Sequence, residues 1–95
     1  MEENSQRLLE HVVDLLNKGE ELSRNGAFVP FDSPEELERK AWLSQVLLFV
    51  ENTLSAKHPF HKLALSYVAG GGFLGIQGML ALLLALRREL EAGMM

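Results

Sequence analysis

The feature that most constrains this chain is the apolar run from Phe73 to Leu86, in which Gln77 is the only strongly polar side chain. A helix made of these 14 residues would be apolar on nearly every side. The run is shorter than the roughly 20 residues that a bilayer-spanning helix needs, and its length is typical of a buried core helix. We therefore expect a helix that is covered by other helices, and we do not expect a membrane partner.

The chain has 95 residues, which favours a single domain over residues 1–95 with one modest core. The net charge is −4, so the basic surface typical of nucleic-acid binding is missing and no nucleic-acid partner is expected. Cysteine is absent, which excludes disulfides and thiolate metal sites. No secretory signal pattern begins the sequence, and together with the lack of cysteine this fits a cytoplasmic location.

The first helix is predicted from Ser5 to Arg24, with Asn4 or Ser5 as its cap. Its apolar residues recur at helical spacing: Leu8, Leu9, Val12, Val13, Leu15, Leu16 and Leu22. Gly19 lies in the helix interior, where glycine costs about 1 kcal/mol relative to alanine. Either a neighbour packs closely at Gly19 or the helix is weak there. Asn25-Gly26 is the predicted stop, because both residue types tolerate positive φ.

The second helix has the clearest start signal in the chain. Ser33 is the predicted cap, Pro34 occupies the first helical position, and Glu36 is the acid of a capping box. We expect this helix to end near Ser55, with its charged early residues (Glu35, Glu36, Glu38, Arg39 and Lys40) in solvent. The core-facing stripe is Trp42, Val46, Phe49, Val50 and Leu54. The preceding linker contains Phe28, Val29 and Phe31, which we expect to lie against the bundle.

A short third helix is predicted to start at His58-Pro59 and to break at Gly70–Gly72. Its expected inward residues are Phe60, Leu63, Ala64, Tyr67 and Val68. The fourth helix runs from about Phe73 to Ala92 and stops at Gly93. No segment shows convincing strand alternation. The prediction is therefore an all-α fold, a compact bundle of about four helices (long, long, short, long) with a central apolar C-terminal helix.

Two explanations remain open for what covers the fourth helix. Three neighbouring helices could wrap it completely, or one apolar face could stay uncovered and bind a partner. Its small residues Gly75, Gly78, Ala81 and Ala85 would let another helix approach closely. We expect Gly78 and Ala81 to face the first or second helix. The predicted contact face is then the opposite one, formed by Leu80, Leu83 and Leu84 with Arg87 and Arg88 at its rim.

The sequence offers few candidates for catalysis or metal binding. His58 and His61 could share a helix face, but a zinc site needs two more ligands, so we interpret them as a solvated helix start. Arg7 and His11 are interpreted as a surface pair. The glycine-rich stretch GGGFLGIQG has neither a dinucleotide fingerprint nor a P-loop lysine and is interpreted as a hinge. Trp42 and Tyr67 are expected in the core. No catalytic residue, cofactor or metal is predicted.

Three segments taken in order resemble a known helical module. They are LLNKGEEL (15–22), the helix around Trp42 to Leu54 with the short helix from Pro59, and GIQGMLALLLALRRELEAG (75–93). The module is found at the N-termini of bacterial conflict-system (anti-phage) proteins, fused to Toll/interleukin-receptor-like or other effector and sensor domains. This resemblance implies an adaptor or oligomerisation module without catalysis. Bacterial death-like adaptor domains, which are helical bundles of similar size, are a neighbouring possibility.

The first functional hypothesis is therefore a non-enzymatic protein–protein interaction module that associates with itself or with a partner helix. The alternative is a small helical bundle that binds an apolar ligand or lipid between its helices. In that case the glycine strip and Met79 would line the space.

Overall fold

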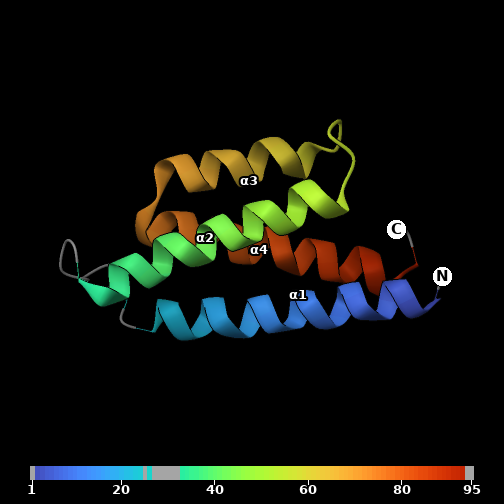
Figure 1. The fold of residues 1–95 in the computed structure, drawn as a ribbon, viewed down its shortest axis with the longest axis horizontal. Coiled ribbons are helices and arrows are strands. Elements are labelled where there is room, and N and C mark those ends of the chain that lie inside the picture. The colour runs from blue at the N-terminus through green and yellow to red at the C-terminus, as the bar shows by residue number, and fades with distance from the viewer. Residues whose placement is uncertain (1, 25, 27–32, 94–95) are drawn as a thin grey trace.

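The computed structural model describes residues 2–24, 26 and 33–93, with side chains from residue 6 onward, and it shows four helices (Figure 1). Their bounds are α1 Glu2–Ser23, α2 Pro34–Thr53, α3 Pro59–Gly70 and α4 Gly72–Glu91. The predicted all-α bundle and its long, long, short, long order are confirmed. The linker residues Phe28, Val29 and Phe31 lie outside the described residues, so their packing stays a prediction.

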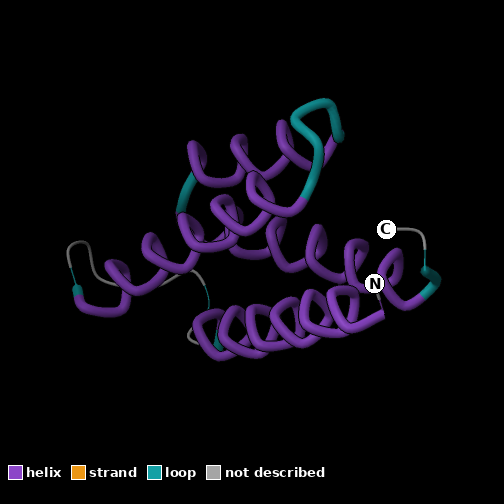
Figure 2. The backbone as a smooth tube through the Cα atoms, turned by 45° about the vertical axis from the view of Figure 1, so that its right-hand side comes forward, coloured by secondary structure: helices purple, strands orange, loops and turns teal. Residues whose placement is uncertain are grey.

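Successive helices run in opposite directions along the bundle, as Figures 1 and 2 show. Helix α4 packs against all three other helices, which confirms its central place, and α2 does the same. Within the described residues, α1 and α3 do not pack against each other. The helices therefore follow the order α1, α2, α3, α4 around the core, with α1 and α3 at opposite corners. None of the helices in the described part of the chain combines the length and apolar character needed to cross a bilayer.

The core is built almost entirely from leucine, valine and aromatic side chains of α1, α2 and α4. The fully buried large side chains are Trp42, Leu43, Ile76, Met79, Leu83, Leu86, Val12, Val46 and Val50. The stripe predicted for α2 is confirmed, since Trp42, Val46, Phe49, Val50 and Leu54 are all buried. Helix α3 contributes only one fully buried residue, Ala64, and covers the core with half-buried side chains such as Tyr67.

Helix α1 begins at Glu2 and ends at Ser23, so the predicted cap at Asn4 or Ser5 is wrong: both residues lie inside the helix. Residues 2–5 contain no glycine or proline that would break the first turn. The predicted stop is confirmed, because Gly26 has a φ of 66° and its N–H donates to the Ser23 carbonyl at 3.0 Å.

Gly19 lies where α1, α2 and α4 meet. A Cβ placed on Gly19 would overlap the ring of Trp42 and would come 2.6 Å from Leu80 Cδ2. The indole Nε1 of Trp42 donates to the Leu15 carbonyl at 3.0 Å, one helical turn before Gly19. The first of the two alternatives for this glycine therefore holds: two neighbouring helices pack closely against it.

The start of α2 confirms the Ser33 cap, whose hydroxyl accepts from the Glu36 N–H at 3.2 Å, with Pro34 at the first helical position. The expectation that Arg39 is solvated is wrong. Arg39 is only 3% exposed, and its guanidinium donates to the Leu22 carbonyl at 3.1 and 2.9 Å and to the Gly26 carbonyl at 2.7 Å. These carbonyls belong to the C-terminal end of α1 and the turn after it, where a cation is favoured. A buried charge is tolerated here because it is hydrogen-bonded.

The short third helix and the fourth helix begin and end close to the predicted residues. Gly71, with a φ of 61°, separates α3 from α4, and Gly93, with a φ of 72°, follows α4. The inward orientation predicted for Leu63 is wrong, since this residue is 42% exposed. Helix α3 packs on α2 and α4 through a narrow stripe, and Leu63 lies outside it on the side of Ser66.

We predict that Gly19→Ala destabilises the protein by about 1–3 kcal/mol, because the new methyl group overpacks the contact with Trp42 and Leu80. Gly70→Ala is the matched control, because no atom lies within 4 Å of the position that its methyl group would take. At this position alanine should leave stability unchanged or raise it by up to about 1 kcal/mol. Urea unfolding measures both variants, and a Gly19→Ala protein as stable as the wild type contradicts the close packing.

We predict that Arg39→Ala lowers the free energy of unfolding by about 1–3 kcal/mol, because two carbonyls near the end of α1 lose their donor. Lys40→Ala is the control one residue away. Lys40 is exposed and lies 3.7 Å from the Glu36 carboxylate, so its loss should cost less than about 1 kcal/mol. Equal destabilisation of the two variants in urea unfolding would show that the buried guanidinium does not stabilise the fold.

Candidate functional site

Of the residues predicted to form the contact face on α4, some are buried in the structure and others are exposed. Leu83 is fully buried, and Leu80 is half-buried against the core next to Gly19, so placing these two on an exposed face is wrong. Leu84 is 45% exposed and Arg88 is exposed. Arg87 is half-buried, and its Nε lies 3.3 Å from the Glu91 carboxylate. Only Leu84 and Arg88 therefore remain on the outer side of the helix.

The true outer face of α4 follows helical spacing from its first turn to its last. It consists of Leu74, Gln77, Ala81, Leu84 and Arg88, all of which are exposed. Leu74 is the most exposed large apolar side chain of the described residues, at 82%. Three of the five residues are apolar, so α4 does keep an uncovered apolar face, rotated relative to the predicted one.

The small residues of α4 also lie on different sides of the helix. A Cβ on Gly75 would come 2.6 Å from the Tyr67 carbonyl oxygen, and one on Gly78 would overlap the Tyr67 ring. Gly78 therefore faces α3 rather than α1 or α2, which corrects the prediction. Ala81 is exposed, so its predicted inside position is wrong as well. At both glycines, therefore, α3 approaches α4 closely.

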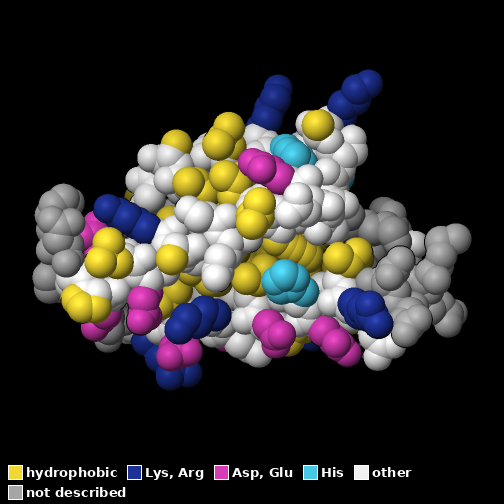
Figure 3. Space-filling view, viewed as in Figure 1, with side chains coloured by type: hydrophobic (Ala, Val, Ile, Leu, Met, Phe, Trp, Pro, Cys, Tyr) yellow, Lys and Arg dark blue, Asp and Glu magenta, His cyan; other side chains and the backbone are white. Residues whose placement is uncertain are grey.

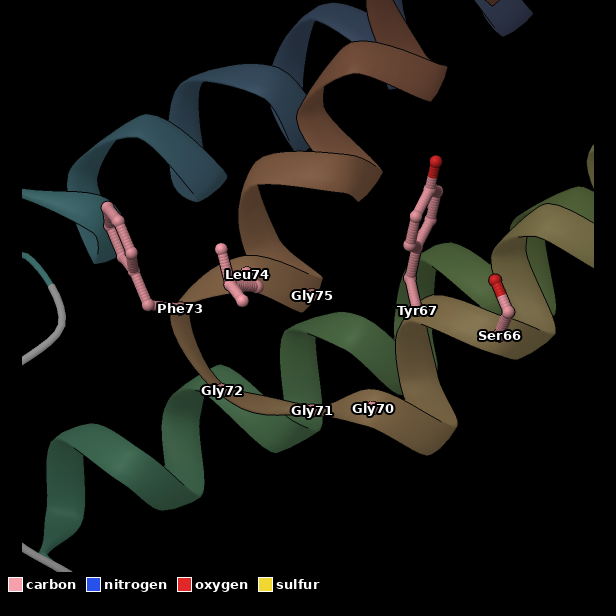
Figure 4. A pocket seen from close by; sticks show the side chains of 8 residues that line it. All are labelled: Ser66, Tyr67, Gly70, Gly71, Gly72, Phe73, Leu74 and Gly75. Carbon is pink, nitrogen blue, oxygen red and sulfur yellow. The ribbon is translucent and has the colours of Figure 1, made fainter.

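A pocket of about 590 Å³ lies at the connection between α3 and α4 (Figure 4). It is lined by Ser66, Tyr67, Gly70, Gly71, Gly72, Phe73, Leu74 and Gly75. In Figure 4 the Tyr67 ring projects from α3 beside the first turns of α4. A Cβ on Gly78 would overlap this ring, so Tyr67 fills the space next to that glycine. Met79 is fully buried in the core. Gly78 and Met79 thus pack against other side chains and do not line this pocket, whereas Gly75 of the predicted glycine strip does.

The two histidines at the start of α3 have structural roles. His58 is the cap of α3, since its Nδ1 accepts from the Phe60 N–H at 3.2 Å, and its Nε2 lies 3.9 Å from the Glu89 carboxylate. His61 Nε2 lies 3.0 Å from the Leu54 carbonyl. Both histidines thus lie at the helix start, as interpreted, but they are half-buried rather than solvated. Within the described residues no three potential metal ligands come together.

A second hollow lies between α1 and α2. We call it the α1–α2 groove, a space of about 320 Å³ lined by His11, Leu15, Gln45, Leu48, Phe49 and Asn52. The His11 ring stacks on Phe49 with 4.5 Å between ring centroids. Leu48 is 58% exposed beside it. His11 and Arg7 are both at the surface, as predicted, but the sequence did not reveal that His11 borders an apolar groove.

Comparison with known proteins found no match: no family model, no curated protein and no solved structure matches the chain. The resemblance to the helical module of bacterial conflict-system proteins therefore stays a prediction. The candidate site therefore rests on the geometry of this chain alone. It consists of the apolar surface outside the bundle, on the outer face of α4 and at the α1–α2 groove.

We predict that Leu83→Ala lowers the free energy of unfolding by about 2–5 kcal/mol, because it leaves a cavity at a fully buried site. Leu84→Ala, one residue along the same helix, should cost less than about 1 kcal/mol because Leu84 is at the surface. Thermal or urea unfolding of the pair tests the rotation of α4. A larger loss for Leu84→Ala than for Leu83→Ala would place the uncovered face elsewhere.

Proposed function

We propose that this protein is a non-enzymatic protein–protein interaction module that brings copies of itself together. The observation that carries this proposal is the outer face of α4, where Leu74 is 82% and Leu84 45% exposed, with the exposed Ala81 between them. Burying a leucine side chain is worth about 1.5–3 kcal/mol relative to full exposure. Single exposed leucines are common, but apolar residues aligned on one helix face are typical of an interface.

The interior supports a binding role because its polar groups are already engaged. Among the described residues, Arg39 is the one buried charged side chain, and it is used to hold the end of α1. Binding at this surface would therefore be driven mainly by the burial of its exposed leucines. The resemblance in sequence supports an adaptor role in bacterial defence or signalling for such a module.

The same packing argues for a surface contact over a ligand held between the helices. Tyr67 occupies the space at Gly78, and Met79 is enclosed by the core. A second copy of the chain or the helix of a partner protein would cover the outer face of α4 without opening the bundle.

We predict that the purified wild-type protein gains mass with concentration in light scattering and that Leu84→Glu shifts it toward monomer. A charge at this position cannot be buried without a partner, so the contact is lost while the helix, exposed there, remains folded. Circular dichroism reports the folding of the variant. Leu37→Glu is the control, because Leu37 is 58% exposed but lies on the first turns of α2.

Two results would contradict the proposal. A wild-type protein that stays monomeric at the highest attainable concentration rules out self-association. A Leu84→Glu protein that is folded and associates as strongly as the wild type removes the outer face of α4 from the contact.

A further inference from the structure

The charges of this chain are distributed unevenly between the two halves of the bundle. Residues 52–88 contain no aspartate or glutamate, although the whole chain has 13 acidic and 9 basic residues. The same segment contains four basic residues, Lys57, Lys62, Arg87 and Arg88. It forms α3 and most of α4, so the acidic residues lie almost entirely on the side of α1 and α2.

The acid-poor half formed by α3 and α4 exposes leucines beside its basic side chains. We define the α3–α4 surface as Leu63, Leu74, Ala81 and Leu84 with Lys62 and Arg88. Its leucines are 42%, 82% and 45% exposed. Within the described residues, neither Lys62 nor Arg88 has an ion-pair partner, whereas the nearby Glu89 is turned toward His58 at 3.9 Å. The surface is therefore apolar with uncompensated positive charge.

The acidic half contains the α1–α2 groove. Asp14 lies one helical turn from His11 and so flanks the groove, whereas Glu51 lies two turns after Ser44, on the side of α2 that faces α3. Neither acid has an ion-pair partner among the described residues, while Lys18 on the same edge is paired with Glu38 at 4.0 Å. Arg7, which is also on this edge, has a partner within the chain. Figure 3 shows apolar atoms between α1 and α2, with acidic side chains along α1.

These two surfaces lie on opposite sides of the bundle, because α1 and α3 occupy opposite corners and α2 and α4 the other two. We propose that the α3–α4 surface of one copy docks on the α1–α2 groove of a second copy, so that the chain assembles head to tail. This inference rests on the proposed self-association and assigns its geometry. A two-fold dimer could not engage both surfaces of each copy, since they face away from each other, so the contact repeats from copy to copy beyond a dimer.

The second copy fits as the occupant in both charge and shape. The uncompensated Lys62 and Arg88 would meet the uncompensated Asp14 beside the groove, and attraction of this kind sets register and orientation at an interface. The groove of about 320 Å³ has room for a leucine side chain, and Leu74 is the most exposed leucine of the α3–α4 surface. Its apolar floor, formed by Leu15 and Phe49, would receive that side chain.

The test uses one variant for each surface. Leu74→Glu places a negative charge on the α3–α4 surface, and Leu48→Lys places a positive charge at the groove. Each should raise the apparent dissociation constant of self-association at least about tenfold, because the introduced charge would face charges of the same sign on the second copy. Both residues are exposed, so circular dichroism and urea unfolding should match the wild type. Leu37→Glu and Leu37→Lys are matched controls, since Leu37 and Leu48 are both 58% exposed on α2.

Mixing the two variants is the decisive step. Each variant keeps one intact surface, so an equimolar mixture should associate in analytical ultracentrifugation although each variant alone is monomeric. The wild type should grow beyond a dimer with concentration, and raising the salt from about 0.05 to about 0.5 M should weaken it because exposed charges are screened.

Several outcomes would overturn the head-to-tail contact. If the wild type associates but the mixture does not, or if growth stops at a dimer, the contact is a different one and the proposed self-association stands. If the wild type is monomeric under all conditions, both proposals fail. If it is monomeric and cosediments with anionic phosphatidylserine vesicles but not with phosphatidylcholine vesicles, the α3–α4 surface binds a membrane and not a second copy.

Discussion

The arrangement of this bundle depends on the contact between Trp42 and Gly19. The indole reaches from α2 across α1 and donates to the Leu15 carbonyl, and it can do so only because Gly19 has no side chain. Leu80 of α4 approaches the same point, so three helices meet there. Arg39 lies one turn before Trp42 on the same face of α2 and binds the Leu22 carbonyl. The two side chains fix α1 along α2 at two points, and the core side chains pack within that register.

Local signals in the sequence were sufficient for the elements of the fold. Ser33 before Pro34, His58 before Pro59 and the glycines at 26, 71 and 93 act within one turn of chain, so they can be recognised without knowing the rest of the molecule. The stripe of α2 was also predictable, because its apolar residues recur at helical spacing along one face. Even the two alternatives at Gly19 were the right ones, although only the structure identifies Trp42 as its neighbour.

The rotation of α4 could not be predicted, for a physical reason. Periodicity reveals a buried face only where polar residues mark the exposed one, and α4 is apolar nearly all round. Adjacent leucines such as Leu83 and Leu84 point about 100° apart on a helix of 3.6 residues per turn, yet they look equivalent in the sequence. The prediction for Arg39 was wrong for a related reason. Arg39 lies in a charged run that is typical of a solvated helix turn. It becomes a buried donor only because it meets the end of α1, 17 residues away in sequence.

The surplus of apolar residues in α4 follows from how the bundle is closed. Because α1 and α3 do not meet in the described part of the chain, α4 lies between them and is covered on two sides and on its core face, but not outside. Helix α3 is short, and only its Ala64 is fully buried, so it does not cover the outer face of α4. The outward leucines of α3 and α4 therefore contribute little to the stability of a single copy. Their burial is favourable only in a contact outside the bundle. Because residues 52–88 contain no acidic side chain, such a contact favours an acidic counterpart, which the chain itself carries on the opposite side.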